Sequence, residues 1–166
     1  MIEEALTYND VLLKPQYSNI KTRSDVNISS MLRGNGPTTH LSLPVIASPM
    51  DTVSEEKMAI AMWQHGGLAV VHRYSTLKRQ VEIIDEIMVG ANSNAAAAIG
   101  TTGDYLERAS ALYEAGARIL CVDVAHGHHI FMKEALANLR AALGDKVHIM
   151  AGNIATLEGY NDLVDW

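Results

Sequence analysis

The stretch ARILCVDVAHGHHIFMKEALANLRAALGDKVHIMAGN, residues 117–153, decides the fold class because it contains a complete strand–helix–strand unit. It opens with a mostly apolar run at 117–123, as expected of a strand that is buried on both faces of a sheet. A segment with helical spacing follows at 129–144 and ends at a glycine. A second apolar run at 147–153 closes the unit. The pattern therefore predicts two parallel strands with a helix between them.

The same alternation continues on both sides of this unit. In the second helix of the chain, Val81, Ile84 and either Ile87 or Met88 form the predicted apolar face. The run of four alanines suits a helix by propensity, but its short length and its flanking asparagine and glycine favour a strand. Outside the unit, the pattern predicts strands at 43–47, 68–72 and 95–100 and helices at 55–65, 76–88, 104–116 and 156–166.

Two architectures suit this alternation, a doubly wound open sheet and a parallel (β/α)8 TIM barrel. No G-x-G-x-x-G sequence follows the first predicted strand, which argues against a nucleotide-binding Rossmann domain. Residues 1–40 lie outside the alternation and are predicted to form an N-terminal arm or hairpin, with a loop at 32–40. Residues 41–166 are predicted to form a partial barrel of about five βα units, truncated in the fifth helix.

Composition and charge exclude several classes of protein. The chain has 166 residues, 48% of them hydrophobic and 19% charged, which is typical of a soluble globular domain. A net charge of -6 lacks the basic surplus of a general nucleic-acid binder. No apolar run is long enough for a membrane span, and the N-terminus lacks the apolar core of a signal peptide. With a single cysteine as well, we expect a cytoplasmic protein that binds neither nucleic acid nor membrane.

Polar side chains cluster where the predicted strands end, which is the edge that carries active sites in both architectures. Ser48 and Met50 follow the first strand and are candidates for one face of a flat polar ligand. For the nearby polar residues a structural role competes, because Asp51, Thr52 or Ser54 could cap the next helix. For Ser54 we expect capping rather than binding.

Asp123 and Asn153 end two further strands. Asp123 is a candidate for accepting hydrogen bonds from ligand hydroxyls, with a helix cap or an ion pair as its structural alternative. Asn153 can both donate and accept a hydrogen bond, but a plain turn asparagine is an equal alternative. His126 and His128 invite a zinc hypothesis, but their spacing in a glycine turn lacks the H-E-x-x-H pattern. We therefore expect no metal site.

The remaining candidate site residues are His72, Arg73 and Cys121. We interpret His72 as a structural histidine, and Arg73 as either an anion contact or a rim residue. Cys121 lies inside the apolar run ILCV, where burial raises the pKa of a thiol and makes it inert. No residue of this sequence is therefore a candidate nucleophile.

Five blocks of the sequence, in this order and at matching intervals, resemble the N-terminal part of the inosine-5′-monophosphate dehydrogenase / GMP reductase family. The resemblance covers nearly the whole chain. The blocks are LTYNDVLLKPQYS (6–18), SPMDTVSE (48–55), MAIAMWQHGGLAVVHRYST (58–76), VDVAHGHH (122–129) and AGNIAT (151–156).

The resemblance implies a (β/α)8 barrel, usually a homotetramer, that acts on a purine nucleoside monophosphate with NAD or NADP as cofactor. By position, Ser48 and Met50 match residues that line the nucleotide site. Asp123 matches the aspartate that binds the nicotinamide ribose, and Asn153 matches an asparagine beside the reacting centre, within reach of both substrate and cofactor. The implied role of these residues is to hold the reactants in register.

Within the family the SPMDTVSE, GGLAVVHR and AHGH blocks favour the dehydrogenase, which converts IMP, NAD and water to XMP and NADH. GMP reductase, which converts GMP and NADPH to IMP and ammonia, is the alternative. It gains support from VDVA, where dehydrogenases have serines in place of Val124 and Ala125. No regulatory CBS pair is inserted after the second predicted strand, which fits either a dehydrogenase without CBS domains or a reductase.

The resemblance further implies a nucleophilic cysteine that follows the sixth strand and is expected beyond Trp166. A potassium-binding loop belongs to the same segment, so a monovalent cation is expected only together with it. We therefore expect the 166-residue chain to be inactive alone. The alternative from another class is a non-catalytic half-barrel that serves as a binding or assembly module.

Overall fold

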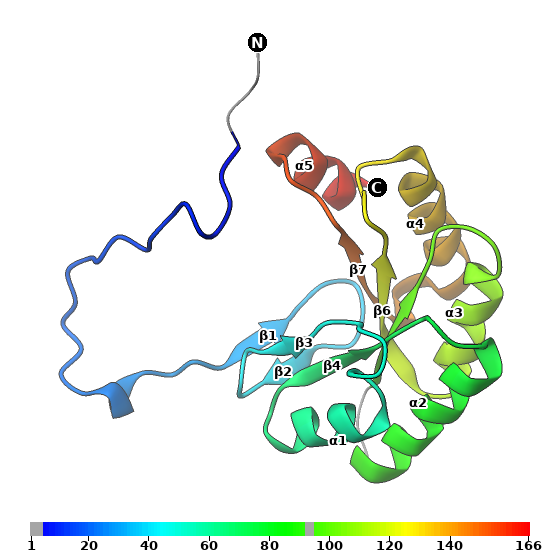
Figure 1. Cartoon of the computed structure of the whole chain (residues 1–166), viewed down its shortest axis with the longest axis horizontal. Helices are drawn as coiled ribbons and strands as arrows, with labels where there is room; N and C mark the ends of the chain where they lie inside the picture. The colour runs from blue at the N-terminus through cyan, green and yellow to red at the C-terminus, as the bar shows by residue number, and fades with distance from the viewer. Residues whose placement is uncertain (1–4, 92–94) are drawn as a thin grey trace.

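A curved sheet of five parallel strands forms the centre of the computed structural model, which describes residues 5–91 and 95–166. Neighbouring strands are consecutive in the chain, and each is followed by a helix (Figure 1). The strands are β3 (Ile46–Ala47), β4 (Leu68–Val71), β5 (Ala95–Ile99), β6 (Ala117–Asp123) and β7 (His148–Gly152). The helices are α1 (Glu56–Gln64), α2 (Leu77–Ala91), α3 (Tyr105–Glu114), α4 (Ile130–Leu143) and α5 (Leu157–Asp165). Short 3-10 turns cover Arg23–Asp25 and Gly144–Lys146.

The two faces of the sheet are covered differently. On the outer face, alternate strand residues such as Val71, Ala97 and Leu120 pack in one apolar cluster with residues of all five helices. On the inner face, Val70, Ala98 and other strand residues form a second cluster that contains no helical residue. A doubly wound sheet would carry helices on both faces. The arrangement is therefore that of a partial (β/α)8 barrel, as predicted.

The inner cluster is closed by an N-terminal hairpin of β1 (Ser30–Leu32) and β2 (Thr39–Leu41). Leu41 is buried in that cluster, and Leu32 packs against it. The ring Nε2 of His148, the first residue of β7, lies 2.6 Å from the backbone carbonyl oxygen of Pro37 in the hairpin loop. The hairpin therefore covers the amino ends of the strands and leaves their carboxyl ends accessible.

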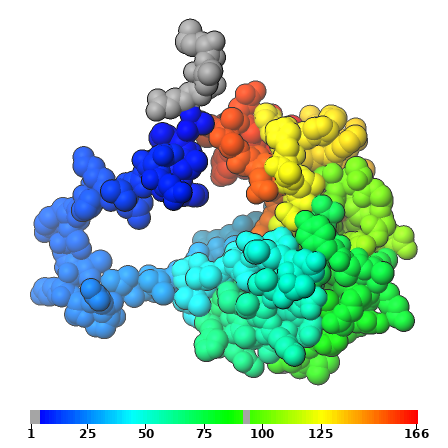
Figure 2. All heavy atoms as spheres, in the orientation of Figure 1, coloured from blue at the N-terminus to red at the C-terminus, as the bar shows by residue number. Residues whose placement is uncertain are grey.

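The segment before the hairpin is extended. Side chains 5–28 are all exposed, and the segment forms a wide loop that extends outward from the hairpin (Figures 1 and 2). Residues 1–4 of the predicted arm lie outside the described residues.

The predicted elements occur in the predicted order, and their bounds agree within two residues except in two places. Strand β3 is only two residues long, and helix α2 continues three residues past its predicted end. On α2 the predicted apolar face is confirmed, because Ile84 and Ile87 are buried and Val81 and Met88 pack half-buried against the same cluster. The buried face also includes Gln80 and Ile83, which the prediction did not name. Hydrogen bonds satisfy the side chain of Gln80 in the interior.

Candidate functional site

The carboxyl edge of the sheet brings together the polar residues that the sequence predicts. Ser48 and Met50 follow β3, and His72 follows β4. Asp123 is the last residue of β6, and Asn153 follows β7 directly. Because the strands are parallel, all of these residues lie at one edge. Asp123 and Asn153 are on adjacent strands, whereas Ser48 and Met50 are at the far end of the sheet.

The loop between β3 and α1 presents Ser48 and Met50 with exposed side chains. The prediction that Asp51, Thr52 or Ser54 caps the next helix is wrong, because the residue before α1 is Glu55 and its side chain makes no cap hydrogen bond. Ser54 is instead fully buried, and its hydroxyl donates to the backbone carbonyl of Ser48. A serine that is satisfied inside its own loop stabilises that loop rather than the helix.

Arg73 reaches across this edge from the end of β4. Its Nε donates a hydrogen bond of 3.2 Å to the backbone carbonyl oxygen of Asp123. The guanidinium passes the end of β5, where a Cβ added at Gly100 would lie 3.4 Å from it. Within the described residues no hydrogen bond or ion pair to the carboxylate of Asp123 occurs, so the structural alternatives for Asp123 find no support there. Its two oxygens are left free to accept hydrogen bonds.

Asn153 is held by the loop after β6. Its side-chain Nδ2 donates to the carbonyl oxygen of Val124 at 3.1 Å, and its backbone N–H donates to the same oxygen at 3.0 Å. The backbone N–H of Gly127 in turn donates to the carbonyl oxygen of Asn153 at 2.7 Å. These bonds fix the orientation of the amide, whose Oδ1 remains available as an acceptor.

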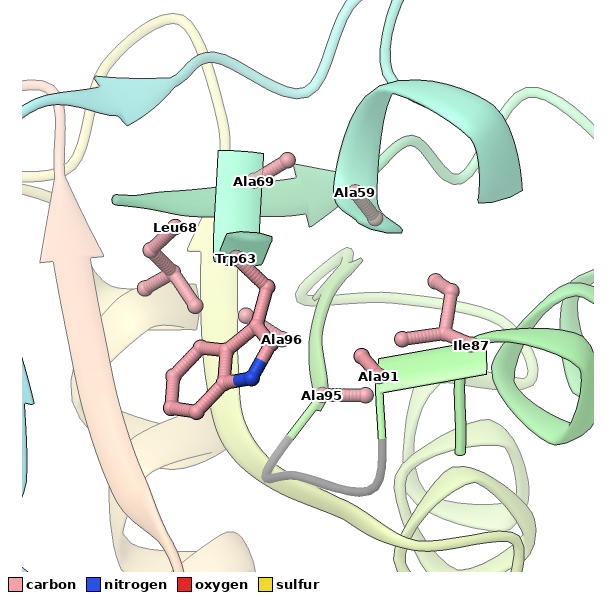
Figure 3. A pocket seen from close by; sticks show the side chains of 8 residues that line it. All are labelled: Ala59, Trp63, Leu68, Ala69, Ile87, Ala91, Ala95 and Ala96. Carbon is pink, nitrogen blue, oxygen red and sulfur yellow. The ribbon is translucent and has the colours of Figure 1, made fainter. Parts of the chain in front are cut away.

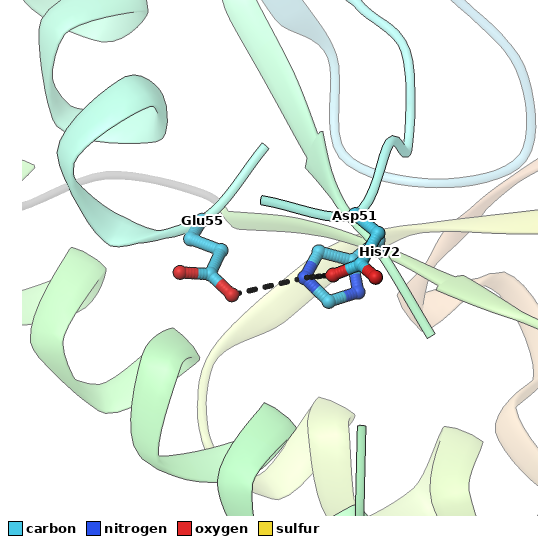
Figure 4. A group of neighbouring side chains, drawn as sticks. All are labelled: Asp51, Glu55 and His72. Carbon is cyan, nitrogen blue, oxygen red and sulfur yellow. Dashed lines mark hydrogen bonds and ion pairs between the residues drawn. The ribbon is translucent and has the colours of Figure 1, made fainter. Parts of the chain in front are cut away.

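His128 and the neighbouring His129 make structural contacts. Nε2 of His128 lies 2.8 Å from a carboxylate oxygen of Asp162 in α5. His129 caps α4, where its ring accepts a hydrogen bond from the backbone N–H of Phe131. The sequence interpretation missed a different group, in which ligand atoms of Asp51, Glu55 and His72 all lie within 4.8 Å of one another (Figure 4). Asp51 and Glu55 belong to one loop, whereas His72 is 17 residues beyond Glu55 and meets them because β3 and β4 are neighbours.

Cys121 lies on the inner face of β6, and burial raises the pKa of its thiol to about 11, with a further contribution from the charge of Asp123. Such a thiol is protonated at neutral pH, which agrees with the prediction that it is inert.

Comparison with known proteins places these features in one family. Residues 5–166 match the IMP dehydrogenase / GMP reductase domain. The chain belongs to this family. Its relatives include GMP reductase 1 of Mus musculus, which is 32% identical over 162 residues covering 96% of this chain and 46% of the relative. GMP reductase of Vibrio cholerae is 30% identical over 165 residues, covering 98% and 47%.

An inosine-5′-monophosphate dehydrogenase of Nitrosopumilus maritimus is 23% identical over 285 residues, covering 98% of this chain and 59% of the relative. That alignment is longer than this chain, so the dehydrogenase carries inserted residues that this family member lacks. The chain spans about half the length of the curated relatives it matches. Among the described residues, no helix is long and apolar enough to cross a membrane.

Two cavities of this family member lie away from the carboxyl edge. One, of about 10 Å³, is lined by apolar residues of α1, α2, β4 and β5, including Trp63 (Figure 3). It has about the volume of a single water molecule, and its described lining is apolar apart from the indole N–H of Trp63, so it is a small packing gap. The other, of about 570 Å³, lies between α4, α5, β7 and the hairpin loop and contains none of the predicted site residues.

Proposed function

We propose that this chain forms part of the substrate and cofactor site of a purine nucleotide oxidoreductase. The observation that carries the proposal is the arrangement at the carboxyl edge, where Ser48, Met50, Asp123 and Asn153 gather on the family's barrel scaffold. A hydroxyl beside a soft apolar side chain suits a ligand that has both a ribose and a flat base. Ser48 and Met50 are therefore assigned to the purine nucleoside monophosphate.

Asp123 is assigned to the ribose of a nicotinamide cofactor, NAD or NADP. Its half-buried carboxylate has two oxygens without a side-chain donor in the described part of the chain, and vicinal ribose hydroxyls are matching donors. When bound, the nicotinamide ring accepts or supplies the hydride. Asn153, held by Val124, would orient substrate and cofactor against each other, so these residues act by positioning.

For the direction of the reaction we favour oxidation of IMP with NAD, on the strength of the SPMDTVSE, GGLAVVHR and AHGH blocks. Reduction of GMP is the second candidate. It is supported by the identity of 30–32% to two GMP reductases, against 23% to the dehydrogenase, at similar coverage of this chain.

None of the described residues supplies the covalent step. Cys121 is protonated and faces the inner cluster, so we assign the family's nucleophilic cysteine, and any bound potassium ion, to polypeptide beyond Trp166. We expect the 166-residue polypeptide to bind nucleotide without turnover and to act as part of a homo-oligomer in the cytoplasm. The non-catalytic assembly module remains the alternative from another class.

The test is a titration of the isotope-labelled 166-residue polypeptide with IMP, GMP, NAD and NADPH, followed by NMR. Saturable shifts at residues 48–50 are expected with a nucleoside monophosphate, and at residues 123 and 153 with a nicotinamide cofactor. Asp123→Asn should weaken cofactor binding about tenfold, because hydrogen bonds to a charged acceptor are lost. It should leave IMP binding unchanged. Asp145→Asn, an exposed carboxylate at the amino edge, is the matched control.

Preferential binding of IMP with NAD supports the dehydrogenase, and preferential binding of GMP with NADPH supports the reductase. The absence of saturable shifts with all four ligands contradicts the proposed function. Steady turnover of either nucleotide by this polypeptide contradicts the assignment of the nucleophile to residues beyond Trp166.

A further inference from the structure

His72 is a buried polar residue at the carboxyl end of β4, only 2% exposed. Its ring Nδ1 lies 3.2 Å from the backbone N–H of Tyr74, which must donate. In the neutral ring, the proton therefore sits on Nε2. Nε2 faces the β3–α1 loop, 3.1 Å from a carboxylate oxygen of Glu55 and 3.8 Å from one of Asp51 (Figure 4). The ring is thus a donor aimed at two carboxylates of that loop.

The backbone of His72 holds the same loop. Its N–H donates to the carbonyl oxygen of Ser54 at 3.3 Å, and the buried hydroxyl of Ser54 donates to the carbonyl oxygen of Ser48. The residue that follows β4 therefore restrains the loop through its ring and through its N–H. The loop needs such restraint because Thr52 has a positive φ of 58°, a strained conformation for a β-branched residue.

The backbone carbonyl group of His72 is itself held by a hydrogen bond from α2. The fully buried Gln80 of α2 donates from Nε2 to the carbonyl oxygens of His72, at 3.0 Å, and of Ala98, at 2.9 Å. The Oε1 of Gln80 accepts a 2.8 Å hydrogen bond from Arg108 of α3, which also pairs with Asp104. The loop is therefore tied through His72 to two helices and to the end of β5.

We propose that His72 is a positioning residue that fixes the 48–55 loop and so presents Ser48 and Met50 to the nucleotide; the proposal rests on the proposed function. The Asp51, Glu55 and His72 group does not indicate a metal site. A cation at Nε2 requires the ring proton on Nδ1, where it would face the N–H of Tyr74. The ring is arranged to donate to the loop.

The test uses two substitutions that separate the acceptor function of Nδ1 from the donor function of Nε2. His72→Asn keeps an acceptor for the N–H of Tyr74 but is too short to reach Glu55. His72→Gln places an uncharged N–H donor near Glu55. Amide hydrogen exchange is measured at Val53 and Ser54, whose N–H groups donate to Met50 within the loop. The affinity for IMP is measured separately.

His72→Asn is expected to accelerate exchange of these two amides about tenfold and to weaken IMP binding about tenfold, as for the loss of one charged hydrogen bond. The amides of β5 to β7 should exchange as in the wild type. His72→Gln should restore both properties most of the way. If His72 contributes only to general stability, amide exchange should accelerate across the whole sheet in both variants, and this result would overturn the proposal. Unchanged exchange at Val53 and Ser54 in His72→Asn would also overturn it.

Glu55→Ala is the second variant, because it removes the other partner without disturbing the buried ring. It should reproduce the local loosening, while Glu56→Ala on α1, which loses an ion pair with Arg79 of α2, should not. Tight binding of Zn²⁺ that depends on His72 would also overturn the proposal. Hydrogen exchange requires no ligand, so the two proposals can be tested separately. If the loop amides respond as expected but the protein binds no nucleotide, the proposed function is refuted and the role of His72 in holding the loop is not.

Discussion

The Nε of Arg73 donates a 3.2 Å hydrogen bond to the backbone carbonyl oxygen of Asp123 and thereby joins the carboxyl ends of β4 and β6 across β5. The two residues are 50 positions apart in sequence. The contact places a cation beside the aspartate that we assign to the cofactor ribose, and it fixes the backbone that carries that carboxylate.

We predict that Arg73→Met weakens binding of NAD about tenfold, since one charge-assisted hydrogen bond contributes roughly 1.5–3 kcal/mol. The measurement is calorimetric titration with NAD. Arg118→Met is the matched control, because this half-buried arginine also donates to backbone carbonyls, those of Tyr113 and Ala117, but at the start of β6. Both variants should lose some stability, and only Arg73→Met should lose affinity. Equal affinities in the two variants would contradict the role of Arg73 at the site.

The strands and helices were predictable from sequence because each strand is short, apolar and enclosed by glycine or polar residues. Even the alanines of β5 were assigned correctly, since their small side chains on both faces suit a strand that is fully buried. The length of β3 was not predictable, because only Ile46 and Ala47 pair with β4 although the apolar run starts earlier.

The polar contacts of the candidate site could not be predicted from the sequence. Glu55 and His72 meet across 17 residues, and Gln80 and Arg108 meet across 28. Pattern analysis does not identify buried polar residues, so Gln80 was not named as part of the core and Ser54 was interpreted as a helix cap. These contacts depend on which strands become neighbours, and that information enters only with the fold.

We predict that Gln80→Leu destabilises the protein by about 2–4 kcal/mol, because it removes one hydrogen bond of the buried Arg108 and leaves two carbonyl groups without their donor. The free energy of unfolding is obtained from urea denaturation. In the double variant Gln80→Leu, Arg108→Leu both partners of the hydrogen bond between these two side chains are removed. The double variant should therefore be less destabilised than the sum of the two single variants, which a double-mutant cycle measures. Simple additivity would contradict the coupling between Gln80 and Arg108.

A third prediction concerns the hairpin that closes the amino end of the barrel. A Cβ at Gly36 would lie 2.3 Å from the backbone N of His148 and 2.4 Å from the carbonyl carbon of Val147, which are backbone atoms that cannot move aside. Gly36→Ala should therefore displace the hairpin loop and cost about 2 kcal/mol or more, as other severe overpacking does. Thermal unfolding measures the loss. Gly152→Ala is the control, since its added methyl would meet nothing within 4 Å. Equal melting temperatures for Gly36→Ala and the wild type would contradict the close packing of hairpin and β7.

The last prediction follows from Cys121, whose thiol pKa is raised to about 11 in the folded protein by burial and then by the charge of Asp123. In the unfolded chain a cysteine titrates near 8.5. Below that pH both states keep the proton, so the favourable burial of the neutral thiol is fully present. Between about pH 8.5 and 11 only the unfolded chain releases its proton, so the free energy of unfolding falls as pH rises, by up to roughly 3 kcal/mol.

The measurement is urea denaturation of wild type and Cys121→Ala at several pH values across this window. Tyrosines and lysines also titrate there, so the informative quantity is the difference in unfolding free energy between the two proteins. Cys121→Ala loses a buried sulfur and should be less stable at neutral pH. Because it has no thiol to ionise, its deficit should shrink as pH rises toward 11. A deficit that stays constant over the whole range would mean that the thiol ionises as readily in the folded protein as in the unfolded chain, and Cys121 would then return as a candidate nucleophile.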